Sequence, residues 1–163
     1  MPPQKQDYML RLIEELARYL AEIRKLRDGG SCDAALLTVL QAQQRLFARP
    51  AQEFMTRSLE EQVHLLVIGE TEANAREKCL AYATLLSEAG QTYQANGHPD
   101  VASGAYQLAL HVLLLTAPQF AGPDGSEIQA RVAALIDHPA VEDLAAEVKA
   151  LLNQFARPAR SDS

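Results

Sequence analysis

The spacing of apolar residues near the start of the chain constrains the fold more than any other feature. Between residues 7 and 28, apolar side chains recur at steps of three and four residues, which places them on one stripe of an α-helix. Two glycines, Gly29 and Gly30, then end the periodic segment. The sequence therefore predicts a long amphipathic first helix, whose apolar stripe contains Met9, Leu12, Ile13, Leu16, Tyr19, Leu20, Ile23 and Leu26.

The rest of the chain continues the helical pattern. Ser58 and Glu61 fit a capping box, in which a hydroxyl and a carboxylate satisfy free backbone NH groups at a helix start. Gly97 and Pro99 indicate a sharp turn between two helices, because glycine tolerates a positive φ and proline suits a first helical turn. No segment shows sustained two-residue alternation with β-branched enrichment. We expect an all-α fold of antiparallel hairpins with no sheet and about seven helices, over residues 7–28, 33–48, 58–69, 72–96, 100–116, 126–137 and 140–155.

Composition indicates one globular domain. The chain has 163 residues, of which 48% are hydrophobic and 22% are charged, and both values are typical of globular proteins. We expect a single helical domain over residues 1–156. Residues 157–163 are predicted to form a flexible C-terminal tail.

Charge and hydropathy disfavour several classes of partner. The formal net charge of -6 provides no broad basic field, so nucleic acid is not an expected partner. The N-terminus lacks the apolar region of a signal peptide, and no stretch approaches the ~20 apolar residues that span a bilayer, so a membrane is not expected either. Cys32 and Cys79 are isolated and lie outside any CxxC pattern, which indicates reduced thiols. We expect a cytoplasmic protein.

A repeat-like pattern of small and aromatic residues covers about residues 83–118. It reads Leu86-x2-Ala89-Gly90-x2-Tyr93, then Gly97, then Ala102-x3-Tyr106-x2-Ala109. This pattern resembles the tetratricopeptide repeat, whose consensus is W-x2-L-G-x2-Y…A-x3-F…P. The resemblance implies a right-handed stack of antiparallel helix hairpins, in which Gly90, Ala102 and Ala109 let two helices touch, and Leu86, Tyr93 and Tyr106 pack between them. Residues 7–14 also resemble the start of a family of small helical bacterial proteins, which implies no activity.

The resemblance to helical repeats also implies a function. Stacks of helical hairpins usually hold a peptide or a partner helix in a concave groove. Helical phase places four residues of the helix over 72–96 on the side facing such a groove, namely Asn74, Lys78, Tyr82 and Glu88. The sequence therefore predicts a non-catalytic protein interaction module, a scaffold or adaptor with a protein or peptide partner. The alternative is a small-ligand carrier or helical enzyme with a cavity between hairpins, lined by Tyr82, Tyr93, Tyr106 and His111.

The first helix allows a second kind of association. Its stripe at Met9, Leu12, Leu16, Tyr19, Ile23 and Leu26 follows a heptad spacing for about two and a half heptads. A helix inside a globular domain shows nearly the same spacing, and sustained coiled coils usually need three or more heptads. We favour packing inside the monomer and keep a homodimer through this stripe as the alternative.

Motifs that carry chemistry are sparse. Glu61-x-x-His64 has the spacing that di-iron helical bundles use, but no second copy exists in the chain, so we expect no metal site. His98 and His138 each precede a proline and fit helix starts, whereas His111 lies in an apolar run and is expected to be partly buried. No nucleophile elbow, phosphate-binding loop or dinucleotide fingerprint occurs. We therefore expect no cofactor and no catalytic residue.

Overall fold

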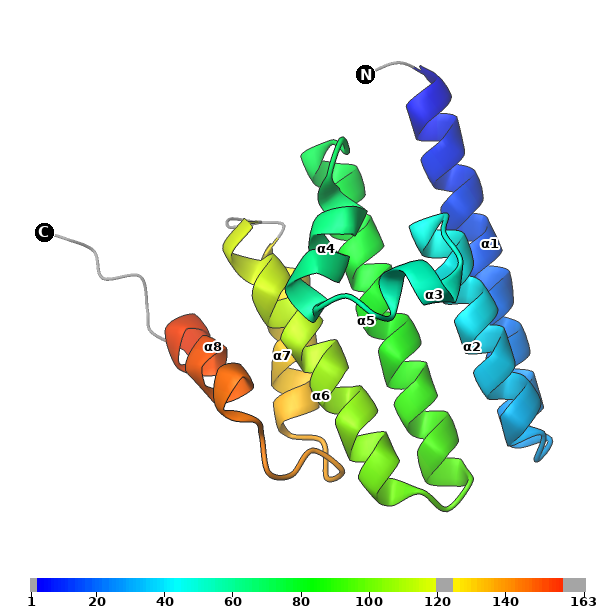
Figure 1. Ribbon diagram of the computed structural model, residues 1–163, viewed down its shortest axis with the longest axis vertical. Coiled ribbons are helices and arrows are strands. Elements are labelled where there is room, and N and C mark those ends of the chain that lie inside the picture. The colour runs from blue at the N-terminus through cyan, green and yellow to red at the C-terminus, as the bar shows by residue number, and fades with distance from the viewer. Residues whose placement is uncertain (1–2, 120–124, 157–163) are drawn as a thin grey trace, which may run out of the picture.

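The computed structural model describes residues 3–119 and 125–156 and shows an all-α protein, as the sequence predicts. Within these residues there are eight α-helices, one short 3-10 helix and no strand (Figure 1). The elements are α1 (Pro3–Asp28), α2 (Cys32–Phe47), α3 (Ala51–Phe54), α4 (Leu59–Val67), α5 (Glu72–Ala95), α6 (Pro99–Thr116), η1 (Ala117–Gln119), α7 (Gly125–Ile136) and α8 (Ala146–Ala156). The predicted tail over residues 157–163 lies outside the described residues.

Helix α5 occupies the centre of the fold. It packs against α1, α2, α4 and α6, and the pair α5 and α6 forms the most extensive helix contact. Figure 1 shows the hairpin of α1 and α2 on one side of α5 and α6, and α8 on the other side. Helix α4 lies in front of the α5 and α6 layer in this view and α7 lies behind it, and both helices contact α6. These two helices therefore cover opposite faces of the same layer.

Local signals in the sequence set several helix ends. The Ser58 hydroxyl accepts a hydrogen bond from the Glu61 backbone NH at 3.2 Å, so the predicted cap of α4 is confirmed. Gly97 has φ +81°, and Pro99 stands in the first turn of α6, as the sequence predicts for this turn. Thr71 caps α5 in the same way as Ser58 caps α4, because its hydroxyl accepts from the Asn74 backbone NH.

Two predicted boundaries are wrong. A short helix, α3, follows Pro50, where only a break was expected, and Phe54 at its end stacks on Phe47 with ring centroids 4.3 Å apart. The last helix begins at Ala146 and not at 140. The Gln107 side chain on α6 explains this later start, because it donates to the Glu142 carbonyl at 2.8 Å and accepts from the Ala145 NH at 3.3 Å. Tertiary contacts thus hold residues 142–145 in a non-helical path.

Most of the apolar stripe of α1 faces the interior of the monomer, and Ile13 is its exposed member. Met9, Leu12, Leu16 and Ile23 have exposed fractions of 5% or less, and Tyr19 and Leu26 are half-buried against the same core. The stripe packs on α2 and α5. The residues considered for self-association are therefore covered by the chain's own helices, which favours the intramolecular interpretation.

One helical segment is apolar enough to cross a membrane by length and composition. It spans Pro99–Gln119 of the described residues, with a mean hydropathy of 1.3, so the prediction that no such stretch exists is wrong. In the fold, 56% of this window is buried among the other helices. The core helix of a folded domain meets the same criteria of length and hydropathy, because it is apolar on several sides.

Candidate functional site

The four residues assigned to a groove by helical phase lie inside the protein. Asn74, Lys78, Tyr82 and Glu88 have exposed fractions between 3% and 8%. Three of them have polar partners in the fold. Lys78 pairs with Glu70 at 2.8 Å, the Tyr82 hydroxyl donates to the Gln62 side chain, and Glu88 pairs with two arginines of α1. The structure therefore buries this side of α5, although Glu88 and Lys78 each still line a cavity on the helix, whereas Asn74 and Tyr82 line neither.

The buried hydroxyl of Tyr82 makes a testable contribution to stability. Burial raises the pKa of Tyr82 to about 12, so the unfolded chain loses this proton near pH 10 while the folded chain keeps it. The contribution is complete below about pH 10 and is lost as the pH rises towards about 12. Urea unfolding between pH 10 and pH 12 measures this loss. We expect the free energy of unfolding of the parent protein to fall by about 2 kcal/mol more over this range than that of Tyr82→Phe. Equal pH dependence in the two proteins would contradict this assignment.

Between residues 77 and 91, the surface of α5 that remains open is a single stripe. Around the middle of this helix most residues are buried, and the partly or fully exposed ones recur at steps of three and four residues. They are Glu77, Ala81, Thr84, Ser87 and Gln91. Two cavities lie along this stripe, and we call the stripe and its two cavities the α5 groove. Its side walls come from α1 on one side and from α7 and His138 on the other.

One end of the α5 groove is apolar. A cavity of about 190 Å³ lies between α1 and α5, with Ala17 and Leu20 on one wall and Ala81 and Leu85 on the other. Ile13 stands at this cavity with 42% of its surface exposed. Apolar surface that is open to water at a concave site favours contact with an apolar partner group.

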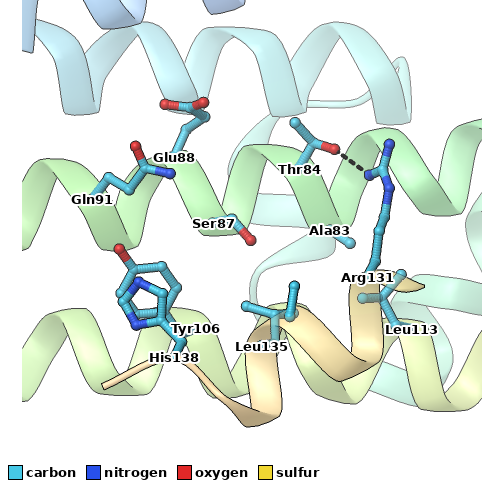
Figure 2. A pocket seen from close by; sticks show the side chains of 11 residues that line it. Ala83, Thr84, Ser87, Glu88, Gln91, Tyr106, Leu113, Arg131, Leu135 and His138 are labelled. Atoms are coloured by element: carbon cyan, nitrogen blue, oxygen red, sulfur yellow. Dashed lines mark hydrogen bonds between the residues drawn. The ribbon is translucent and has the colours of Figure 1, made fainter. Parts of the chain in front are cut away.

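The other end of the groove is polar and aromatic. A cavity of about 280 Å³ lies between α5, α6 and α7 (Figure 2). Figure 2 shows Tyr106 and His138 at one end of this cavity and Thr84 with Arg131 at the other. The rings of Tyr106 and His138 contact each other at a tilt of 35° with centroids 4.2 Å apart, and His138 Nδ1 accepts a hydrogen bond from the Ala140 NH. Because Nδ1 is an acceptor there, the neutral ring carries its proton on Nε2.

Arg131 on α7 separates the two ends of the groove. It lines both cavities, and its guanidinium donates to the Thr84 hydroxyl at 2.6 Å and to the Leu80 carbonyl at 3.3 Å. It also pairs with the exposed Glu127 at 3.1 Å. These contacts tie α7 to α5 and place a cation in the middle of the groove.

Glu88 supplies the main negative charge beside the polar cavity. Its carboxylate is 3% exposed and lies 2.8 Å from Arg24 and 2.6 Å from Arg27, both on α1. Each oxygen therefore pairs with a different guanidinium, which offsets the cost of burying the charge. This cluster joins α1 to α5 beneath the groove.

The repeat-like residues lie where α5 meets α6. Leu86, Ala102 and Ala109 are buried, Tyr93 is half-buried, and Tyr106 is 1% exposed. A Cβ added to Gly90 would lie 3.0 Å from the Tyr106 ring, so the absence of a side chain at Gly90 lets the ring sit against the helix backbone. Of the four residues proposed to line a ligand cavity, Tyr106 lines the polar cavity, whereas Tyr82, Tyr93 and His111 do not line it.

Neither Cys32 nor Cys79 lines the groove. The two free thiols, Cys32 and Cys79, are buried, and burial raises the pKa of the Cys79 thiol, which makes it a poor nucleophile.

Sequence reasoning missed the groove residues because they are small and polar. The signal that could have found them is the row of small or polar residues at helical spacing on an otherwise buried helix. Comparisons with protein-family models, with curated proteins and with solved structures found no match.

Proposed function

We propose that this protein is a non-catalytic interaction module whose α5 groove binds an amphipathic helical segment of a partner protein. The observation that carries the proposal is the single open stripe over residues 77–91 of α5, with an apolar cavity at one end and a polar cavity at the other. Helix-in-groove recognition uses this arrangement, because a partner helix presents anchors at steps of three, four and seven residues.

The dimensions of the groove suit a short helix. From Glu77 to Gln91 the stripe covers about four helical turns, or about 21 Å. Small side chains such as Ala81, Thr84 and Ser87 form its floor, which allows the backbone of a partner to approach closely. Helices α1 and α7 provide walls along part of this length.

The chemistry of the groove specifies its partner further. Apolar side chains of the partner would fill the cavity beside Ile13 and Leu20, where aliphatic groups leave water. An acidic residue of the partner would face Arg131, whose present carboxylate partner, Glu127, is exposed and replaceable. We therefore expect a segment with apolar residues on one face and a carboxylate near its middle. We also propose that it acts in the cytoplasm, where free thiols such as Cys32 and Cys79 stay reduced.

Selection from a phage-displayed library of random 16-residue peptides tests the proposal. We expect enriched peptides to share apolar residues at helical spacing and an acidic residue, and to bind the purified protein. Ala81→Arg should weaken their binding by at least about tenfold, because a long charged side chain then occupies the apolar floor. Ala133→Arg is the matched control, since Ala133 is exposed on α7 and lines neither cavity.

Two outcomes would overturn the proposal. One is that no peptide is enriched over an empty support. The other is that Ala81→Arg and Ala133→Arg bind the enriched peptides equally well while both variants keep the circular dichroism of the parent.

The polar cavity favours a second candidate, a small-molecule carrier. Its volume of about 280 Å³ is close to the lower end of known ligand pockets, roughly 300 Å³, and the polar residues Ser87, Gln91 and His138 line it together with the aromatic ring of Tyr106. A metabolite that raises the melting temperature of the parent protein and of Ala81→Arg, but not that of Ser87→Phe, would support this candidate over the peptide site.

A further inference from the structure

Three helices that are far apart in the chain bring one histidine and two carboxylates together. Glu60 lies on α4, His111 on α6 and Glu147 on α8, and one ligand atom from each lies within 4.8 Å of the others. Helix α4 packs on the face of α6 opposite α7 (Figure 1), so this cluster is separate from the α5 groove. We call these three residues the His111 cluster.

His111 is the feature that distinguishes this cluster from an ordinary group of surface acids. The residue is 8% exposed, and its Nε2 atom is buried without a hydrogen-bond partner among the described residues. Buried polar atoms are nearly always paired, because leaving one unpaired costs its desolvation energy. An unpaired nitrogen that faces two carboxylates therefore calls for a cation between them.

The distance from His111 to Glu60 fits a shared metal ion better than a hydrogen bond. Nε2 lies 3.6 Å from Oε1 of Glu60, beyond normal hydrogen-bond length. Two ligands of a tetrahedral zinc ion, each about 2.0 to 2.2 Å from the metal, lie roughly 3.4 Å apart. The carboxylates of Glu60 and Glu147 are exposed, so both can rotate to complete the approach.

We propose that the His111 cluster binds a divalent transition metal, with Zn²⁺ as the ion that fits its donors best. One imidazole nitrogen and two carboxylate oxygens are common zinc ligands, whereas magnesium and calcium sites in proteins consist of oxygen donors. Three protein ligands leave a fourth position for water. The neighbouring Glu61, which has Glu-x-x-His spacing with His64, pairs instead with Arg57 at 3.6 Å.

The bound metal ion would fix helix α8 to the rest of the domain. Helix α8 packs mainly on α6, and Val148 is its one fully buried residue among those described. A metal bond from Glu147 would fix α8 to α6 and α4 together. Binding to the folded state alone would then stabilise the whole domain, since the three ligands are separated in the unfolded chain.

The proposal is tested by isothermal titration calorimetry. The full chain is first treated with chelator and is then titrated with zinc chloride. We expect one ion per chain and a rise in melting temperature of about 5 °C or more at a hundredfold excess over Kd. Glu60→Gln and Glu147→Gln should each weaken binding at least about tenfold, and His111→Gln should abolish it. Glu142→Gln and His98→Ala are matched controls, because both residues are exposed and lie outside the cluster.

The two carboxylate variants keep the test decisive even where His111→Gln fails to fold, because Glu60 and Glu147 are exposed and their loss removes no core packing. The proposal is overturned by the absence of binding heat in the parent protein. It is equally overturned where Glu60→Gln and Glu147→Gln bind zinc as tightly as the parent, since the ion would then lie elsewhere. Both outcomes are independent of peptide binding in the α5 groove.

Discussion

The free energy of unfolding is expected to fall by about 3 to 5 kcal/mol when Tyr106 is replaced by alanine, because a large ring leaves a cavity that the fold cannot close. Tyr106 is the largest of the side chains with less than 2% exposure. Its ring lies against α5 at Gly90 and contacts the His138 ring at a tilt of 35°. Urea unfolding followed by circular dichroism measures the loss. Tyr93→Ala is the control, since Tyr93 is half-buried and should lose less.

The contact between Gly90 and Tyr106 gives this prediction a second test. A Cβ at Gly90 would meet two ring carbons at 3.0 Å, and the buried ring has little room to move. In the parent protein Gly90→Ala should destabilise by roughly 1 kcal/mol, because overpacking exceeds the gain in helix propensity. In the Tyr106→Ala background the same change should stabilise by about 1 kcal/mol, since only the propensity gain remains. The same sign in both backgrounds would show that the ring does not limit this position.

The all-α fold could be predicted because its signals are local. Apolar spacing in α1, the capping hydroxyl of Ser58 and the turn at Gly97 each act within a few residues of the chain. Such features need no knowledge of neighbouring helices. The predicted start of α8 was wrong for the opposite reason. Gln107, more than thirty residues away in the chain, holds the segment before α8 in a non-helical path.

The candidate sites could not be predicted because they depend on neighbours. Asn74, Lys78 and Glu88 are polar, so a helical wheel places them towards water, yet each is buried in the central helix. Glu88 is stabilised there by arginines more than sixty residues away. The same limitation applies to the His111 cluster, whose members come from three helices. Spacing within one helix therefore gave neither the burial of these side chains nor the meeting of Glu60, His111 and Glu147.

Glu88→Leu is expected to lower the free energy of unfolding by about 3 kcal/mol, because breaking a buried ion pair leaves the remaining charge without compensation. The effect should come mainly from Arg27, whose side chain is 13% exposed, whereas that of Arg24 is 53% exposed and can turn towards water. Glu127→Gln serves as the control. It removes the exposed pair with Arg131 and should change stability by about 0.5 kcal/mol or less.

A double variant separates loss of the ion pair from loss of packing at Glu88. Arg27→Met removes the charge that Glu88→Leu leaves buried, while its chain still fills the space between α1 and α5. The pair of substitutions should therefore recover most of the stability that Glu88→Leu loses, because apolar replacements of a buried ion pair are often neutral or stabilising. Urea unfolding of the parent, both single variants and the double variant gives the coupling. If the losses of unfolding free energy in the two single variants simply add in the double variant, Arg27 is already solvated. Packing alone would then make Glu88 important for joining α1 to α5.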